Sequence, residues 1–232
     1  MDKITNEFKF QCQMTACCCT KMEIFLNPYD ILQIAKKTKM TTTEVIENYV
    51  LFLKSKDTGF IRPIFKSARS SLCSFNNNKL CSIHDHRPLS CRLFPLARIG
   101  GEFYLQDAEF CQGLKVDYNM KLSEYLSEDE GEEYLKSADL YHKIMDDLKV
   151  SGSSIIENKY YYDLLNILLF DFDYFYNGEY IDLKSFEKSQ LSFHLADKLI
   201  QTFNIEPDID KKTLLENLYL EGDRFIAKNI KK

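Results

Sequence analysis

The chain has 232 residues, of which 45% are hydrophobic and 28% charged, so it can bury a full core as one large domain or two small ones. Its 35 acidic and 30 basic side chains give a formal net charge of -5, which argues against a nucleic-acid partner. The sequence contains no uncharged apolar stretch long enough for a bilayer, and its first residues lack the pattern of a secretory signal. We therefore expect a cytoplasmic protein without a membrane partner.

Two helices are predicted near the N-terminus. Residues 27–40 begin with Asn27 as a candidate N-cap and Pro28 in the first turn, and apolar side chains follow at helical spacing. Residues 41–55 begin with threonines that can cap a helix, and their apolar side chains also recur at helical spacing as far as Leu53. We expect one continuous helix over each of these segments.

The segment over residues 60–107 has a different pattern. Its apolar runs are short, and polar or glycine-rich stretches interrupt them. Residues 96–105, LARIGGEFYL, favour a β-hairpin with its tight turn at Gly100 and Gly101. Loops are expected to dominate the rest of this segment.

Helical patterns return after Leu122. Four amphipathic stretches are predicted as helices, over residues 132–152, 159–178, 185–203 and 211–230. Gly152 and Gly178 are the expected ends of the first two helices, and Pro207 separates the last two. The aromatic run at residues 160–176 is interpreted as a thick core helix, with an aromatic ligand groove as the alternative.

These patterns predict a mainly α fold. The N-terminal half is cysteine-rich, with loops and a small β-hairpin, and the C-terminal half is all-helical. We expect two domains, a cysteine-cluster domain over residues 1–120 and a helical domain over residues 121–232.

All the cysteines lie in the first half of the chain, and three of them are consecutive. In a reducing compartment they would not persist as disulfides, and adjacent cysteines make strained partners, so a disulfide framework is the weaker interpretation. Thiolates are strong ligands for zinc and iron, and eight of them in one half favour metal binding over eight small buried side chains. The candidate ligands are Cys12, Cys17, Cys18, Cys19, Cys73, Cys81, Cys91 and Cys111.

The spacing of the cysteines leaves the kind of metal centre open. Only the interval from Cys12 to Cys17 resembles the short knuckle of a structural zinc site. Eight ligands suffice for two zinc ions, for two four-iron clusters, or for one cluster with further redox thiols, and the irregular spacing favours iron-sulfur. Neighbouring thiols could serve different metals, because consecutive side chains point apart in an extended strand, or one of them could be left over.

Two arginines stand between and beside the cysteines of residues 81–95, CSIHDHRPLSCRLFP. A four-iron core bound by four thiolates carries a net negative charge. A guanidinium can balance this charge and also donate hydrogen bonds to sulfur. Arg87 and Arg92 are therefore predicted to contact a bound cofactor. Phe94 and Pro95 could shield the metal from water.

The segments FKFQCQMTACCC, IFLNPYDILQIAKKTKMTTTEVIENYV and LCSFNNNKLCSIHDHRPLSCRLFPLARIGGEFYL, followed by CQG, resemble the YkgJ-type cysteine-cluster family of zinc- or iron-chelating domains. This family includes the flagellin lysine N-methylases, and the resemblance covers residues 8–113. It implies that all eight cysteines are family cysteines, and that the Arg-Pro and Cys-Arg-Leu-Phe-Pro elements belong to the same site.

Three features depart from the family pattern. The family commonly has a C-x2-C-x2-C-C element where this chain has three contiguous cysteines, so one of those thiols could be idle. His84 stands where an aromatic residue is usual, and Gln112 replaces a proline. His84 and His86 are alternative ligands, although histidines in such loops more often face solvent or form hydrogen bonds.

The resemblance implies a 4Fe-4S cluster and the transfer of methyl groups from S-adenosylmethionine to lysines of a protein substrate such as flagellin. The chain has no G-x-G-x-x-G turn, so no methyl-donor site is visible in the sequence and no catalytic residue is assigned. The competing hypothesis is a non-enzymatic zinc-binding module that presents its helical half to a partner.

Overall fold

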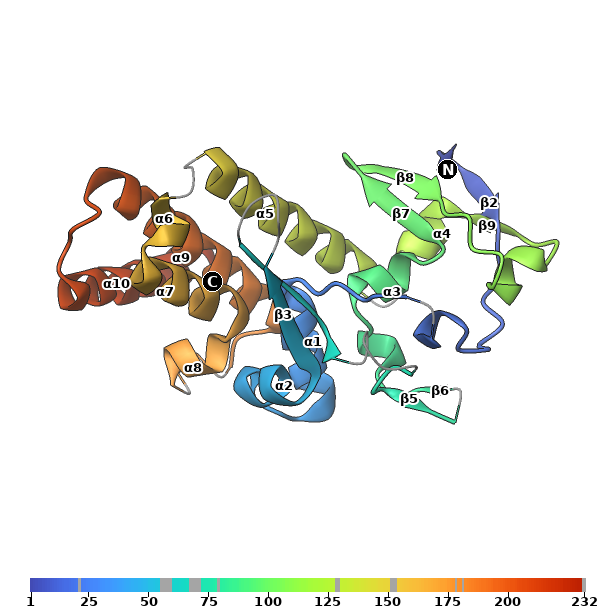
Figure 1. Ribbon diagram of the computed structural model, residues 1–232, viewed down its shortest axis with the longest axis horizontal. Coiled ribbons are helices and arrows are strands. Elements are labelled where there is room, and N and C mark those ends of the chain that lie inside the picture. Colours follow the sequence, from blue (N-terminus) through green and yellow to red (C-terminus); the bar gives the residue numbers. More distant parts are fainter. Residues whose placement is uncertain are drawn as a thin grey trace.

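The computed structural model describes residues 1–20, 22–54, 60–66, 72–78, 80–127, 130–150, 154–177, 179–180 and 182–230. The predicted helix ends at Gly152 and Gly178 lie outside these residues. The molecule is elongated, with the long helices at one end and most of the short strands at the other (Figure 1). In the described part of the chain, no helix is both long and apolar enough to cross a membrane.

The C-terminal half is helical, as predicted. Helix α9 (Ser185–Ile205) lies at its centre, in contact with α5 (Gly131–Val150), α7 (Lys159–Phe170) and α10 (Lys211–Asn229). The shorter helices are α4 (Leu122–Ser127), α6 (Ser154–Glu157) and α8 (Phe172–Tyr176). Pro207 lies between α9 and α10, where a break was predicted.

The predicted helix over residues 159–178 is divided at Asp171, which was not expected. Its carboxylate accepts a hydrogen bond from the Tyr174 backbone N–H (3.3 Å), and so caps α8. The same carboxylate accepts the hydroxyls of Thr42 (2.9 Å) and Thr43 (2.8 Å). Because both threonines lie at the start of α2 (Thr42–Tyr49), contacts with a distant segment determine where the aromatic helix breaks.

Helix α1 (Pro28–Thr38) starts as predicted. The Asn27 side chain accepts a hydrogen bond from the Asp30 backbone N–H (3.0 Å), and the Asp30 carboxylate accepts one from the Asn27 backbone N–H (2.8 Å). This reciprocal capping box satisfies two backbone donors at the helix N-terminus. Helix α1 also contacts α9 and α5, and so joins the N-terminal half to the helical half.

The predicted continuous helix over residues 41–55 is wrong beyond Tyr49. Helix α2 ends there, and the chain continues directly as strand β3 (Val50–Lys54), which pairs with β4 (Ile61–Phe65). The residues of β3, VLFLK, include β-branched and aromatic side chains that fit a half-buried strand. Pairing with a segment later in the chain therefore overrides the helical spacing of its apolar residues.

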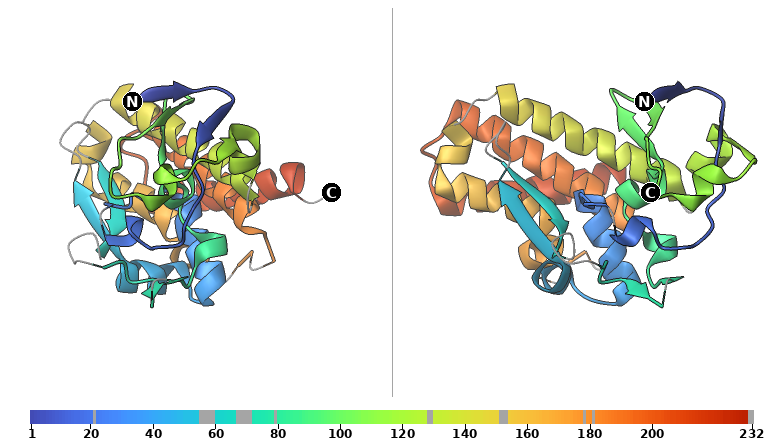
Figure 2. Two further views of the ribbon diagram at one scale, coloured as in Figure 1. Left: turned by 90° about the vertical axis from the view of Figure 1, so that its right-hand side faces the viewer. Right: turned by 45° about the vertical axis from the view of Figure 1, so that its right-hand side comes forward.

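The remaining strands are short and antiparallel. The predicted hairpin is confirmed as β7 (Leu96–Ile99) and β8 (Glu102–Leu105), and Gly100 and Gly101 have positive φ angles of 58° and 83° in its turn. The other strands are β1 (Asp2–Ile4), β2 (Glu7–Lys9), β5 (Asn76–Asn77), β6 (Leu80–Cys81) and β9 (Asn119–Lys121). Strand β1 joins the hairpin at β8, and β2 pairs with β9, so the N-terminus lies beside residues 102–121 (Figure 2).

Two hydrophobic cores hold these elements together. The large core consists of buried apolar side chains of α1, β3, β4 and α5 to α10, together with neighbours such as Ile24, Phe75 and Ile83. The small core lies at the strand-rich end and consists of Phe8, Phe10, Phe94, Leu96, Ala108 and Cys111. The predicted division at residue 120 stays a prediction, and the large core draws side chains from both sides of it.

Candidate metal centre

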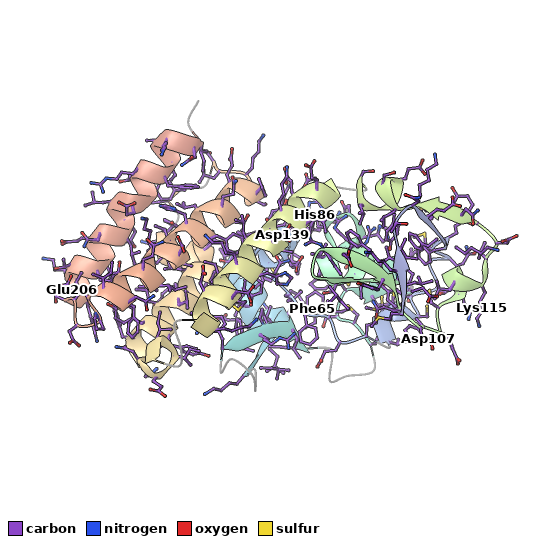
Figure 3. All side chains as sticks on the ribbon, turned by 90° about the horizontal axis from the view of Figure 1, so that it is seen from above. Phe65, His86, Asp107, Lys115, Asp139 and Glu206 are labelled. Carbon is purple, nitrogen blue, oxygen red and sulfur yellow. The ribbon has the colours of Figure 1, made fainter. Side chains whose placement is uncertain are left out.

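A cavity of about 370 Å³ contains the predicted metal ligands in its wall. All eight are present, namely Cys12, Cys17, Cys18, Cys19, Cys73, Cys81, Cys91 and Cys111. The rest of the wall includes Phe65 and Ile83 of the large-core region, and Phe10 and Phe94 of the small core. Met22 lines the cavity and packs against both cores, so the cavity lies between them. Phe65 is in the middle of the molecule, away from both Glu206 and Lys115 (Figure 3).

Short backbone contacts bring the cysteines on the large-core side together. The Cys73 backbone N–H donates to the Cys19 carbonyl (3.0 Å), and the Asn76 backbone N–H donates to the Cys73 carbonyl (3.0 Å). Cys81 lies opposite Asn76 in the β5–β6 pair. Cys91 lies in helix α3 (Leu89–Leu93) and packs against the large core.

A glycine brings the first and last cysteines of the sequence together. The Gln11 backbone N–H donates to the Gly113 carbonyl (3.1 Å), next to Cys12 on one segment and close to Cys111 on the other. A Cβ atom at Gly113 would lie 2.7 Å from the Gln11 carbonyl oxygen and 2.7 Å from the ring of Phe10. Only glycine permits this approach, so the Gly of the CQG element shapes the small-core side of the cavity.

The three consecutive cysteines form a tight turn. Ala16 has a positive φ of 55°, the Cys19 backbone N–H donates to the Ala16 carbonyl (3.0 Å), and residues Cys18–Thr20 form one turn of 3-10 helix. In such a turn neighbouring side chains leave the backbone in different directions. Cys18 packs against the small core, whereas the Cys19 backbone binds Cys73.

Two neighbouring thiols of this turn, Cys18 and Cys19, change each other's pKa. The hydrogen bond with Cys18 lowers the pKa of Cys19 to about 6, helped by a hydrogen bond from Asn76, and it raises the pKa of Cys18. The contact with Cys18 therefore favours the thiolate form of Cys19, although burial opposes it. The thiolate is the form that binds metal.

Two further thiols of the cavity wall, those of Cys91 and Cys111, have raised pKa values. Burial raises the pKa of Cys91 well above its usual value, and the charges of Cys73, Cys81 and Cys19 raise it further. Burial likewise raises the pKa of Cys111, backbone hydrogen bonds from Gly113 and Leu114 oppose that rise, and the charges of Cys17 and Cys12 add to it. A bound cation would reverse both effects, because it stabilises the thiolates that burial and mutual repulsion disfavour.

The donor set consists of thiols, which are ligands for zinc or iron. None of the eight cysteines forms a disulfide, which contradicts the disulfide interpretation. Among the described residues, no three His, Cys, Asp or Glu side chains already lie where they could hold one metal ion. A tetrahedral zinc site would need sulfur atoms about 3.8 Å apart, given its Zn–S bonds of about 2.3 Å. An iron-sulfur cluster holds its cysteines farther apart, because iron and sulfide stand between them.

The two arginines predicted to contact a cofactor lie in different places. Arg87 lines the cavity and donates to the His84 carbonyl (2.7 Å). Burial raises the pKa of Cys81, and the charge of Arg87 opposes that rise, so Arg87 acts on the thiols. Arg92 is buried outside the cavity wall, with its guanidinium 4.1 Å from the ring centre of Tyr134. The cofactor role of both arginines stays a prediction.

The neighbouring positions of the motif also differ in their placement. Phe94 lines the cavity and stacks on Phe110 at 5.7 Å, as a shield against water would. His84 lines the cavity, whereas His86 lies 3.3 Å from the Asp85 carboxylate. His84 is therefore the better placed of the two alternative ligands.

Sequence reasoning missed Asp30, a buried carboxylate that positions one wall of the site. Besides capping α1, it accepts a hydrogen bond from the Leu89 backbone N–H (2.8 Å) at the start of α3, the helix that carries Cys91. Burial raises the pKa of Asp30 to about 7. The capping-box spacing from Asn27 was the available signal, but a bond to a residue 59 positions away leaves no local pattern.

Comparison with known families supports this picture of the site. Residues 11–112 match the CxxCxxCC family, described as "Putative zinc- or iron-chelating domain". Over this segment, the resemblance to a cysteine-cluster family that was predicted from the sequence is confirmed. Neither the search of curated proteins nor the search of solved structures gave a significant match.

Proposed function

We propose that the chain is an iron-sulfur protein whose cysteine cavity binds iron-sulfur of the 4Fe-4S type. The observation that carries the proposal is the arrangement of eight thiols, none of them in a disulfide, around one cavity of about 370 Å³. A cluster fills such a space with its own iron and sulfide atoms. Arg87 would balance its negative charge, and Phe94 would keep water away.

The proposed compartment is the cytoplasm, where free thiols of this kind persist. The net charge of -5 argues against nucleic acid as a partner, and no membrane partner is proposed.

The proposed activity is methyl transfer from S-adenosylmethionine to lysines of a protein such as flagellin. It is supported by the resemblance of residues 8–113 to the family that includes the flagellin lysine N-methylases. When bound, a cluster supplies redox-active iron to the cavity. The competing hypothesis is a zinc-binding interaction module without catalytic activity.

Metal analysis of anaerobically purified protein separates these hypotheses. A brown protein with broad absorption near about 400 nm, containing iron and acid-labile sulfide, is the expected result. Colourless protein with stoichiometric zinc and no capacity to take up iron would contradict it. Cys81→Ser and Cys91→Ser should each bind less metal than the wild-type protein, and Ser82→Ala, which changes the residue next to Cys81 without removing a thiol, should bind the full amount.

Methyl transfer is tested by incubating the iron-loaded protein with S-adenosylmethionine and flagellin and measuring methylated lysine by mass spectrometry. Methylation by the wild-type protein, and none by Cys91→Ser, is the expected result. Full iron loading without any lysine methylation would overturn the activity while leaving the iron-sulfur assignment intact.

A further inference from the structure

Five of the eight thiols around the cavity belong to, or pack against, one of two different cores. Cys73, Cys81 and Cys91 pack against the large core. Cys111 is part of the small core, and Cys18 packs against it. Since the two cores are separate bodies of buried side chains that meet at the cavity, each presents its own group of thiols to it.

Backbone hydrogen bonds assign two more thiols to these groups. Cys19 joins the large-core group, because its carbonyl accepts the Cys73 backbone N–H (3.0 Å). Cys12 joins the small-core group, because the neighbouring Gln11 binds Gly113, two residues beyond Cys111. Both contacts use main-chain atoms, so the assignment does not depend on how the thiols rotate.

Cys17 is the remaining thiol, and we assign it to the small-core group because the large-core group already has four thiols. Its carbonyl accepts the Thr20 hydroxyl (3.0 Å), which closes the turn in which Cys17 and Cys18 precede Cys19. Cys18 and Cys19 touch each other at the boundary between the groups.

We propose that the cavity holds two metal centres, each bound by four thiols. The large-core centre uses Cys19, Cys73, Cys81 and Cys91, and the small-core centre uses Cys12, Cys17, Cys18 and Cys111. This inference rests on the proposed metal-binding function and deepens it. In it, the three consecutive cysteines are divided between the centres at the bond from Cys18 to Cys19, and none of them is left over.

Single and double Cys→Ser variants test this division. Each full-length variant is reconstituted anaerobically with ferrous iron and sulfide, and iron per chain is measured. Cys73→Ser and Cys111→Ser should each keep about half of the wild-type iron, because each removes one ligand from a different centre. Adding Cys81→Ser to Cys73→Ser should cause no further loss, whereas adding Cys111→Ser should remove the remaining iron.

Cys18 and Cys19 are adjacent in the sequence but are assigned to different centres, so their variants give the sharpest test. Cys18→Ser should show the Mössbauer spectrum of Cys111→Ser, and Cys19→Ser should show that of Cys73→Ser. Met120→Leu and Ile83→Val are the matched controls, since both side chains line the cavity, one on each side, without offering a thiol. Circular dichroism verifies that every variant keeps its helices, and a variant that does not is replaced by another cysteine of the same group.

Three results have distinct meanings. Loss of all iron in every single variant would overturn the division in favour of one shared centre. The division would also be overturned if each single variant kept about half of the iron but Cys18→Ser and Cys19→Ser gave the same Mössbauer spectrum. Wild-type protein that binds neither iron nor zinc would instead overturn the proposed function itself.

Discussion

The two cores differ in what holds them together. The large core is built from helices and two strands, and its thiols add to a body that already buries many apolar side chains. The small core rests on six buried residues and short strands, and one of those residues is itself a cysteine. Because small cores bury too little apolar surface to be stable alone, we expect a bound metal to stabilise the strand-rich end much more than the helical end.

Removing the metal should therefore have the largest effect, and an uneven one. After chelation under reducing conditions, we expect amide protection to disappear in β1, β2 and β9 while α9 and α10 stay protected. Hydrogen exchange read by mass spectrometry measures both regions in the same sample. Equal loss of protection in both regions would mean that the two cores form one cooperative unit.

Gly113→Ala should damage the small-core side selectively. The new Cβ atom would lie 2.7 Å from the Gln11 carbonyl oxygen, and a backbone atom cannot move aside as a flexible side chain can. We expect iron per chain to fall by about half while the helical circular dichroism is unchanged. Gly222→Ala is the matched control, because its Cβ atom would meet only ordinary contacts at 3.8 Å. Equal iron content in both variants would contradict the role of Gly113.

Asp30→Ala should destabilise the large-core side. It removes the acceptor for the backbone N–H groups of Asn27 and Leu89, and both bonds involve a buried carboxylate. We expect a loss of about 3 kcal/mol in the free energy of unfolding, measured with urea. The exposed Asp146→Ala should cost less than about 0.5 kcal/mol. Similar losses in the two variants would show that the link between α1 and α3 is unimportant.

The same carboxylate should make stability depend on pH. Burial raises the pKa of Asp30 to about 7 in the folded protein, from its usual value of 3.8, and it does so against the backbone hydrogen bonds from Asn27 and Leu89 and the positive charge of Arg92. The folded state therefore binds a proton that the unfolded state has lost, so stability falls as pH rises. Relative to Asp30→Asn, the wild-type protein should lose about 2 kcal/mol between pH 5 and pH 7. A constant difference across that interval would contradict the raised pKa.

The smallest expected effects separate the two arginines. Arg92→Lys should lower stability by about 1 kcal/mol, since lysine cannot reproduce the planar stacking on Tyr134. Arg87→Lys should leave stability nearly unchanged but shift the reduction potential of the bound cluster, because Arg87 lines the cavity. Electrochemistry and urea unfolding of both variants measure the contrast. A shift in potential for Arg92→Lys alone would reverse these assignments.

Local sequence signals predicted the parts of the fold that local interactions determine. The capping box at Asn27 and the glycine turn of the β7–β8 hairpin each depend on residues a few positions apart, and both were found. The gathering of the cysteines around one cavity followed from their chemistry and from the family resemblance.

Features that depend on distant residues could not be predicted. Strand β3 has helical spacing, but it pairs with β4 across residues 55–60 of the chain. Strands β1 and β2 need partners about a hundred residues later, and the bond from Asp30 to Leu89 spans 59 residues. The division of the thiols between two cores has the same cause, because it depends on which distant segments pack together.

Anomalous scattering at the iron edge, from crystals grown without oxygen, tests the central claim most directly. The account predicts iron peaks inside the cavity between the two cores, within bonding distance of sulfur atoms from all eight cysteines. A map with no metal peak in that cavity, and with the thiols oxidised in pairs or separately buried, would contradict it.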